Sequence, residues 1–325
     1  MEQVSLEYKQ LGRSGLTVSV AGLGANNFGR RNSLKETLQI VNAAFDLGVN
    51  FIDTADQYGN GSSEELLGEV LKGRRHSVVL ATKVGGKMAG STEPARGSRR
   101  YIRWEVENSL RRLQTDFIDL YYLHRPDPLT PIEETLAAME ELVKDGKVRY
   151  IGSSNFTGWQ IADAEWTARH LRTTRFIAAQ NEYHLLNRRI ESEVTPACLE
   201  YGIGIVTSRP LAHGFLTGKY QRGEAPPAGT RLAVREIAKV DMDFDLIDAL
   251  QDFSRQRAVT LLDVAFGYVL HNRAVVSVIA GATSIEQLQA NALAIRWRPT
   301  AEDLEALEEI LAMPFSAPSE ETRAR

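Results

Sequence analysis

The chain of 325 residues lacks most features that mark secreted, membrane-embedded or nucleic-acid-binding proteins. Its single cysteine, Cys198, cannot form an internal disulfide, so a reducing, cytoplasmic setting fits best. No stretch approaches the roughly 18 apolar residues of a transmembrane helix, and the first residues lack the apolar core of a secretory signal. The formal net charge of -4 gives no electrostatic basis for binding nucleic acid or an anionic membrane.

Several catalytic signatures are missing as well. None of the six histidines stands in an H-E-x-x-H motif, and one cysteine is too few for a zinc ribbon, so we expect no metal site. There is no G-x-S-x-G elbow and no P-loop, and "GLGANNFG" does not match the G-x-G-x-x-G fingerprint of a doubly wound sheet. The remaining polar residues suit proton transfer coupled to a cofactor.

What the chain does contain is an alternation of short apolar runs with amphipathic, helix-capped segments. Most runs are continuous, which is typical of strands buried on both faces. Helix caps such as Ser33 with Glu36, Ser98 and Thr260 open the segments between them. The eight runs span residues 18–24, 49–53, 78–82, 117–123, 148–152, 176–180, 203–207 and 275–280.

This alternation predicts an α/β fold with parallel strands and right-handed crossovers. Eight units suit a closed (β/α)8 TIM barrel, which typically takes about 250 residues. We expect one domain over 1–325, with the barrel at about 18–296 and a C-terminal helix and tail over 297–325. The additions to the barrel are an N-terminal hairpin over 5–17, a long loop over 214–242, and extra helices near 243–256 and 300–312.

Four polar residues fall at or just after predicted strand ends: Asp53, Tyr58, Lys83 and His124. In a parallel barrel all such ends open onto one face, so these side chains should converge on one pocket. Lys83 would lower the pKa of Tyr58, with Asp53 holding the lysine charged, and His124 would polarise a substrate oxygen. Tyr58 would then be a tuned proton donor.

Each of the four residues also has a plain structural reading when taken alone. Asp53 suits a helix cap or salt bridge, Lys83 a solvated charge, Tyr58 a packed turn and His124 a hydrogen-bonded loop residue. It is the combination at neighbouring strand ends that favours an enzyme.

At these residues the chain resembles the aldo-keto reductases over roughly residues 6–312. "FIDTADQYGNGSSEELLG", "LATKVG" and "DLYYLHRPD" are similar to that family's aspartate–tyrosine, lysine and histidine motifs. The resemblance implies that Asp53, Tyr58, Lys83 and His124 form the catalytic tetrad, with Tyr58 as general acid. It also implies a barrel that binds NADPH across its C-terminal mouth and reduces a small carbonyl substrate.

The resemblance also implies a set of cofactor contacts. "IGSSNF" and "AAQNEYHLL" suggest that Ser154, Asn155 and Gln180 hold the nicotinamide carboxamide, while "SRPLAHGFLTGKY" is similar to a pyrophosphate-embracing loop. For Gln287, a role as the helix-capping partner of Ser284 is an interpretation as good as a cofactor contact. The further implied contacts are Ser208, Leu211, Gly214, Lys219, Arg231, Gly281, Thr283, Gln287 and Asn291.

The chain departs from the family's pattern in two places. Ser208 stands where many relatives carry an aromatic residue that stacks on the nicotinamide, and Arg209 replaces the next serine. In the adenosine segment, Thr283 and Gln287 are neutral where a basic residue often binds the 2′-phosphate. A preference for NADPH over NADH therefore rests mainly on Lys219 and Arg231.

The internal loops resemble the branch that includes potassium-channel β subunits and bacterial reductases. The sequence thus predicts an NADPH-dependent carbonyl reductase; the alternatives are a cofactor-sensing binding module with slow turnover, and a non-redox barrel such as an isomerase. Specificity should come from loops 25–32, 84–97, 125–130 and 214–242. Basic residues in these loops, including Lys87 and Arg96, either form a solvated rim or favour an anionic or polyhydroxylated substrate.

Overall fold

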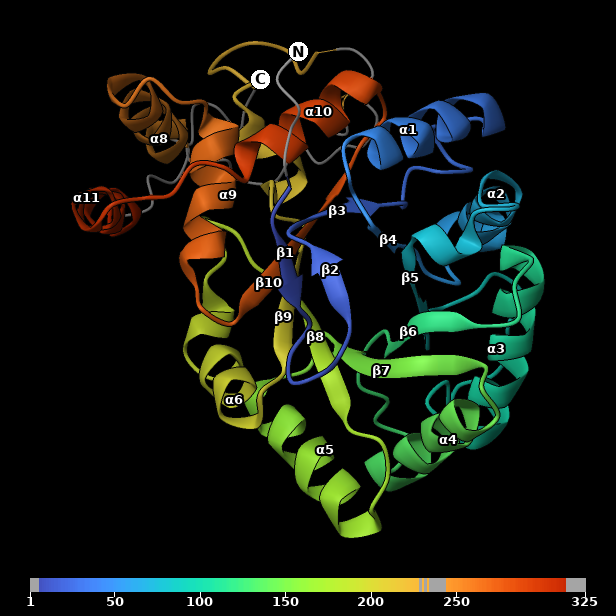
Figure 1. The fold of residues 1–325 in the computed structure, drawn as a ribbon. Helices are drawn as coiled ribbons and strands as arrows, with labels where there is room; N and C mark the ends of the chain where they lie inside the picture. Colours follow the sequence, from blue (N-terminus) through green and yellow to red (C-terminus); the bar gives the residue numbers. More distant parts are fainter. Residues whose placement is uncertain (1–5, 228–229, 231–232, 234–243, 314–325) are drawn as a thin grey trace.

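At the centre of the molecule lies a closed barrel of eight parallel strands, in the order β10-β3-β4-β5-β6-β7-β8-β9 (Figure 1). The structure is a computed structural model that describes residues 6–227, 230, 233 and 244–313. Each strand pairs with the next along the chain, and β10 closes the circle against β3. The strands are β3 (Ala21–Gly24), β4 (Phe51–Asp53), β5 (Val79–Val84), β6 (Ile118–Leu123), β7 (Val148–Ser154), β8 (Phe176–Glu182), β9 (Gly204–Ser208) and β10 (Val275–Gly281). The predicted (β/α)8 barrel is confirmed.

One helix of the outer ring follows each strand, and sequence caps set where several of these helices begin. Ser33 and Thr260 make reciprocal capping boxes with Glu36 and Asp263, and the Ser98 side chain accepts from the Tyr101 backbone N–H. The ring consists of α1 (Leu34–Asp46), α2 (Ser62–Val70), α3 (Arg99–Leu113), α4 (Ile132–Lys144), α5 (Gly158–Leu171), α6 (Val194–Tyr201), α9 (Leu261–His271) and α10 (Ile285–Ala294). Short 3-10 turns are η1 (Tyr58–Gly61), η2 (Arg75–Ser77), η3 (Arg189–Glu191) and η4 (Ala212–Thr217).

The N-terminal hairpin covers the end of the barrel at which the strands begin (Figure 1). Its strands, β1 (Tyr8–Gln10) and β2 (Thr17–Ser19), pair antiparallel. The run 18–24, expected as one barrel strand, is divided, and only Ala21–Gly24 enters the barrel. At the end of β2, where the pairing partner changes, the Ser19 backbone N–H donates to Asn50 Oδ1 at 2.7 Å. The apolar run thus serves two sheets.

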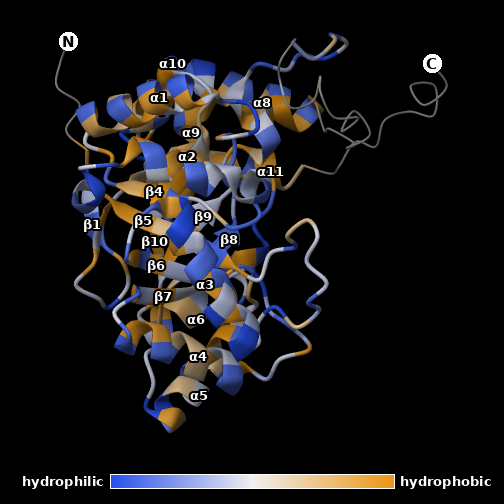
Figure 2. Cartoon of the chain, turned by 90° about the vertical axis from the view of Figure 1, so that its right-hand side faces the viewer, coloured by the Kyte–Doolittle hydropathy of each residue, from blue (hydrophilic) through white to orange (hydrophobic). Residues whose placement is uncertain are grey.

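A cluster of apolar side chains fills the barrel interior at the end where the strands begin. Leu11 of the hairpin packs there with Phe51, Tyr122 and Val206 from the strands, and all four are buried. A second, larger core lies between the strands and the helices. The helices carry both hydrophilic and hydrophobic residues (Figure 2). Apolar side chains thus fill the end of the barrel at which the strands begin. Polar side chains of the strands meet at the opposite, carboxyl-terminal end.

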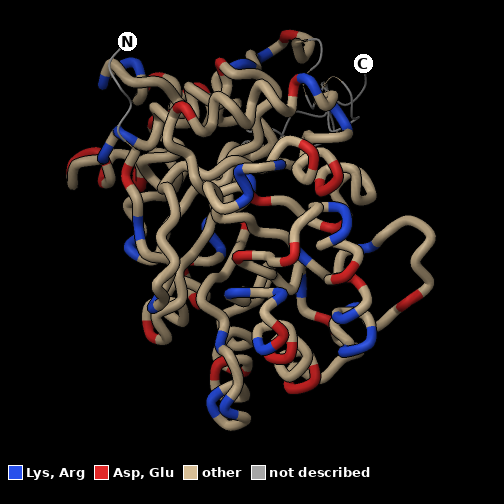
Figure 3. Tube along the Cα trace, turned by 45° about the vertical axis from the view of Figure 1, so that its right-hand side comes forward, with Lys and Arg blue, Asp and Glu red and all other residues tan. Residues whose placement is uncertain are grey.

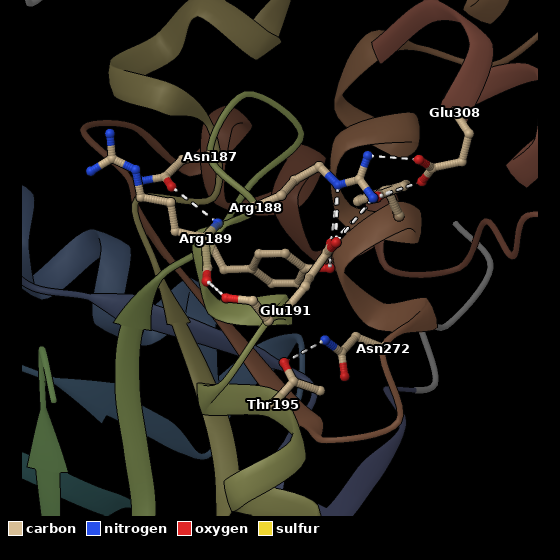
Figure 4. A network of polar contacts seen from close by, with 10 residues as sticks. Asn187, Arg188, Arg189, Glu191, Thr195, Asn272 and Glu308 are labelled. Carbon is tan, nitrogen blue, oxygen red and sulfur yellow. Dashed lines mark hydrogen bonds and ion pairs between the residues drawn. The ribbon is translucent and has the colours of Figure 1, made fainter. Parts of the chain in front are cut away.

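Two helices are added to the ring, as predicted. They are α8 (Phe244–Gln256) and α11 (Ala301–Leu311), which lie together outside α9 (Figure 1). Arg188 ties α11 to the segment before α6, because its guanidinium donates to Glu308 Oε2 at 2.8 Å and to Glu191 Oε2 at 2.9 Å (Figure 4). The Tyr268 hydroxyl of α9 donates to Glu308 Oε1 at 3.0 Å. The extra helix α11 is thereby anchored to the barrel wall.

Charges of both signs are interspersed along the helices (Figure 3). Within the part of the chain that the structure describes, no helix is both long and apolar enough to span a membrane.

Candidate active site

Three neighbouring strands bring the first group of predicted residues together. Asp53 is the last residue of β4, Lys83 lies near the end of β5, and His124 directly follows β6. Tyr58 is the first residue of η1, five residues after the end of β4. The turn is possible because Gly59, Asn60 and Gly61 all take positive φ, at 60°, 57° and 95°.

Lys83 and Asp53 form a buried ion pair at the base of this group. Lys83 Nζ donates to Asp53 Oδ2 at 2.6 Å and to the Thr54 carbonyl oxygen at 2.7 Å. Gln180 Nε2 donates to the other Asp53 oxygen at 2.8 Å. Burial alone would lower the pKa of Lys83, but the charge of Asp53 and the hydrogen bonds to Asp53 and Tyr58 outweigh it and raise that pKa. The lysine is therefore held as an ammonium ion.

The ammonium of Lys83 lies below the Tyr58 ring, with 5.1 Å between Nζ and the ring centroid. Burial raises the pKa of Tyr58 above its usual value of 10, although Lys83 opposes this rise by its charge and a side-chain hydrogen bond. Lys83 lowers the pKa of Tyr58, as expected, but desolvation is the larger effect, so the net shift is upward rather than downward. Tyr58 is a protonated phenol throughout the neutral range.

His124 stands edge-on to Tyr58, with ring centroids 6.1 Å apart and an interplanar angle of 81°. Its backbone N–H donates to the Val84 carbonyl oxygen at 2.7 Å, and its own carbonyl oxygen accepts from Asn155 Nδ2 at 2.8 Å. Burial, followed by the charges of Lys83 and two arginines, holds the pKa of His124 well below its usual range. His124 is therefore a neutral imidazole that can donate one N–H.

Gln57 is a member of the site that sequence reasoning did not identify. Its Nε2 lies 3.4 Å from His124 Nε2, and its Oε1 accepts from the Lys87 backbone N–H at 3.2 Å. Its position directly before Tyr58, on the same turn, is the only sequence signal that could have indicated this contact.

The residues expected at the nicotinamide, and Gly281 of the expected adenosine segment, lie on the other half of the barrel mouth. Ser154 ends β7, Gln180 lies in β8, Ser208 ends β9 and Gly281 ends β10. Asn155 bridges the two halves, because its N–H donates to the Gln180 carbonyl oxygen at 2.9 Å while its side chain holds the carbonyl of His124. The structure therefore gathers these residues around the same opening as Asp53, Tyr58, Lys83 and His124.

The loop after β9 carries the expected pyrophosphate residues. Leu211 precedes η4, and Gly214 lies within it with φ of +104°. A Cβ at Gly214 would approach Lys219 Nζ to 2.9 Å, so the glycine makes room for the lysine. Arg231 lies outside the described residues.

The start of α10 carries the expected adenosine residues Thr283, Gln287 and Asn291. Gln287 Oε1 accepts from the backbone N–H and the hydroxyl of Thr283 at 2.9 and 3.0 Å. Ser284 caps the helix by accepting from the Gln287 N–H at 3.3 Å. Gln287 thus has a capping role, directed at Thr283 rather than at the N–H of Ser284, while Asn291 is buried one turn further along.

Comparison with known proteins agrees with this geometry. Residues 21–312 match the model of the aldo/keto reductase family. The chain belongs to the aldo/keto reductase family. It is thus an oxidoreductase of a family that typically uses NAD(P)H to reduce small carbonyl compounds.

Three relatives of this aldo/keto reductase cover nearly the whole chain. A probable voltage-gated potassium channel subunit beta from Oryza sativa is 36% identical, covering 94% of this chain and 97% of the relative. A protein of the same description from Arabidopsis thaliana is 37% identical, with 89% and 91% covered. The uncharacterized oxidoreductase YrpG of Bacillus subtilis is 38% identical, with 95% and 97% covered. These relatives agree with the expected branch.

This aldo/keto reductase carries an arginine beside the position where the stacking aromatic is replaced. Arg209 follows Ser208 with φ of +51°, and its guanidinium donates to Glu182. Hydrogen bonds from His184 and Arg209 lower the pKa of Glu182 to about 2, despite its partial burial. Arg209 also contributes to the electrostatic field at Tyr58 and His124. The sequence alone indicates this substitution but no role for the arginine.

Proposed function

We propose that this protein reduces an aldehyde or ketone to an alcohol with NADPH, and that Tyr58 is the general acid. The observation that carries the proposal is the buried Lys83–Asp53 ion pair, with a 2.6 Å contact, directly below the Tyr58 ring. A buried charge pair is costly to desolvate, and here it places a fixed ammonium next to a phenol at the mouth of a barrel. We also propose that the chain works as one barrel unit.

Proton transfer follows from this arrangement. Bound NADPH would supply a hydride to the carbonyl carbon. Tyr58 gives its phenolic proton to the carbonyl oxygen, which becomes the hydroxyl of the product, and the phenolate that remains is stabilised by Lys83. Neutral His124 donates a hydrogen bond to the same oxygen and orients it toward Tyr58. Solvent returns the proton to Tyr58 after the reaction.

The residues of the second half of the mouth fit such a cofactor. Asn155 and Gln180 already use their amide N–H groups within the protein, at His124 and Asp53, so their amide oxygens can accept from a carboxamide. Lys219 beside Gly214 provides a cation over the loop, and the N-terminus of α10 favours phosphate. We therefore propose that Ser154, Asn155 and Gln180 hold the nicotinamide, with Lys219 and the α10 start near the phosphates.

A cofactor-sensing module with slow turnover is the second candidate. It is favoured by two plant relatives whose names describe them as probable potassium channel β subunits. The complete set of Asp53, Tyr58, Lys83 and His124 favours catalysis over binding alone.

Titration of tryptophan fluorescence with NADPH and NADH, followed by addition of 4-nitrobenzaldehyde, tests the proposal. Tighter binding of NADPH with consumption of the cofactor supports a reductase. Binding without consumption, repeated with several aldehydes and ketones, favours the sensing module. No binding of either nucleotide contradicts both.

A further inference from the structure

A small hollow of about 130 Å³ lies between the loop after β5 and the loop after β6. Gly85, Arg96 and Gly97 line one side of it, and segment 125–129 lines the other. Gly85 follows Lys83 by two positions and Arg125 directly follows His124, so the hollow adjoins the strand ends that carry the tetrad. A larger hollow, lined by Leu110 and Asp116, opens at the opposite end of β6 and has no relation to the site.

Two arginines without carboxylate partners define the chemistry of this hollow. Among the described residues, neither Arg96 nor Arg125 lies within 4.0 Å of a carboxylate oxygen, the limit for a salt bridge. The Nε of Arg96 is buried without a hydrogen-bond partner in the described part of the chain. A buried cationic donor without an acceptor is costly, and an anion beside Arg96, which lines the hollow, would compensate its charge.

The acid that lines the hollow does not neutralise these arginines. Asp127 Oδ2 accepts from the Gly97 N–H at 2.6 Å and from the Thr130 hydroxyl at 2.7 Å. Its Oδ1 accepts from the Leu129 N–H at 3.0 Å. Asp127 therefore joins the two loops that form the hollow, while its hydrogen-bonding capacity is largely used by their backbone. One carboxylate against two guanidinium groups leaves the hollow with a net positive charge.

We propose that this hollow binds an anionic group of the substrate, so that the carbonyl compound carries a carboxylate or a phosphate. The inference rests on the proposed function for the identity of the ligand as a substrate. The proposed cofactor contacts lie at the ends of β7, β8, β9 and β10, so the loops after β5 and β6 border the part of the mouth left for substrate. Planar guanidinium groups suit both anions because they form paired hydrogen bonds with oxyanions.

Steady-state kinetics with a matched pair of aldehydes tests this proposal. The carboxylate 4-formylbenzoate is compared with its neutral methyl ester for the wild type, Arg96→Gln and Arg125→Gln. The ratio of kcat/KM, carboxylate over ester, should exceed one in the wild type and fall about 10- to 100-fold in each variant, mainly through KM for the carboxylate. Arg100→Gln is the matched control, because Arg100 is exposed on α3 and its guanidinium is 3.5 Å from Glu93, outside the hollow.

A binding measurement keeps the test independent of turnover. Calorimetric titration with 4-methylbenzoate, 4-methylbenzamide and inorganic phosphate should show binding of at least one anion, loss of that binding in Arg125→Gln, and no binding of the amide. Binding of phosphate without 4-methylbenzoate would indicate that the anionic group of the substrate is a phosphate. Binding of 4-methylbenzoate without phosphate would indicate a carboxylate. Equal use of ester and carboxylate by an active enzyme would overturn the inference and leave the reductase intact. Anion binding without aldehyde turnover would support the hollow and contradict the proposed function.

Discussion

The side-chain amide of Gln57 lies 3.4 Å from His124 Nε2, while its oxygen is held by the Lys87 backbone N–H. This arrangement turns the amide NH₂ of Gln57 toward the imidazole of His124. Gln57 is thus the polar side chain in contact with the His124 ring, and a change of its charge should be felt at His124.

Gln57→Glu should make the reduction depend on pH between about 5 and 8, where histidines near a carboxylate titrate. The wild type should show no such limb at saturating cofactor, because burial keeps the pKa of His124 well below its usual 6.5. The measurement is kcat/KM for the aldehyde against pH, with Gln57→Ala as the neutral control. A wild-type limb centred near pH 6.5 would show that His124 titrates normally and would contradict this account.

Replacement of Lys83 by Met should destabilise the protein, because the Asp53 carboxyl would stay buried without its ion-pair partner. The expected loss is about 3–5 kcal/mol in the free energy of unfolding. The double variant Lys83→Met/Asp53→Asn should recover much of that stability while staying inactive. Urea unfolding and aldehyde turnover, measured on the same samples, check the two parts. Recovered activity in the double variant would mean that the ion pair serves folding alone.

Asp56→Asn should stabilise the protein, and more at pH 8 than at pH 4.5. Asp56 is fully buried, and burial, followed by the charges of Glu105 and Glu64, raises the pKa of its carboxyl well above 3.8. The native state then holds a proton that the unfolded state releases above about pH 4, so this group lowers stability as the pH rises. Asparagine keeps the oxygen that accepts from the Gln57 N–H at 2.6 Å.

Unfolding by urea at the two pH values measures this effect. Glu69→Gln is the control, because hydrogen bonds from Lys72 and Gln114 lower the pKa of that exposed carboxyl and give the opposite, smaller dependence. A pH-independent gain in Asp56→Asn would show that Asp56 is ionised in the folded protein.

Arg231→Ala should weaken binding of NADPH more than that of NADH, because a 2′-phosphate is the only charge that distinguishes the two cofactors. Fluorescence titration with both nucleotides gives the two dissociation constants, and a change of about tenfold in their ratio is expected for a lost charged hydrogen bond. Arg222→Ala is the matched control, since Arg222 pairs with Asp248 at 2.9 Å. Equal weakening of both cofactors would show that Arg231 does not contact the 2′-phosphate.

The sequence predicted the barrel and the gathering of four polar residues because both depend on periodicity and on strand order. Continuous apolar runs indicate parallel strands, and parallel strands place their carboxyl ends together. The first strand boundary was wrong because the apolar run continues across Ser19 from β2 into β3, although the two strands pair with different partners. Hydrophobic pattern does not record such a change.

The chemistry of individual side chains was less accessible from the sequence. The sign of the Tyr58 pKa shift depends on how completely the phenol is desolvated, which no spacing reveals. The roles of Gln57 and Arg209 depend on where a turn directs a side chain, and Arg209 has a positive φ that its residue type does not suggest. The Arg96–Arg125 hollow depends on two loops packed against each other through Asp127.

Turnover of Tyr58→Phe at matched cofactor occupancy shows whether Tyr58 is the general acid. NADPH affinity is measured first, and the alcohol formed from 4-nitrobenzaldehyde is then quantified under saturating NADPH for the variant and the wild type. We expect a nearly unchanged affinity for NADPH and a kcat lower by about 100- to 10,000-fold, the usual contribution of a general acid. Undiminished alcohol formation by Tyr58→Phe would show that another group delivers the proton.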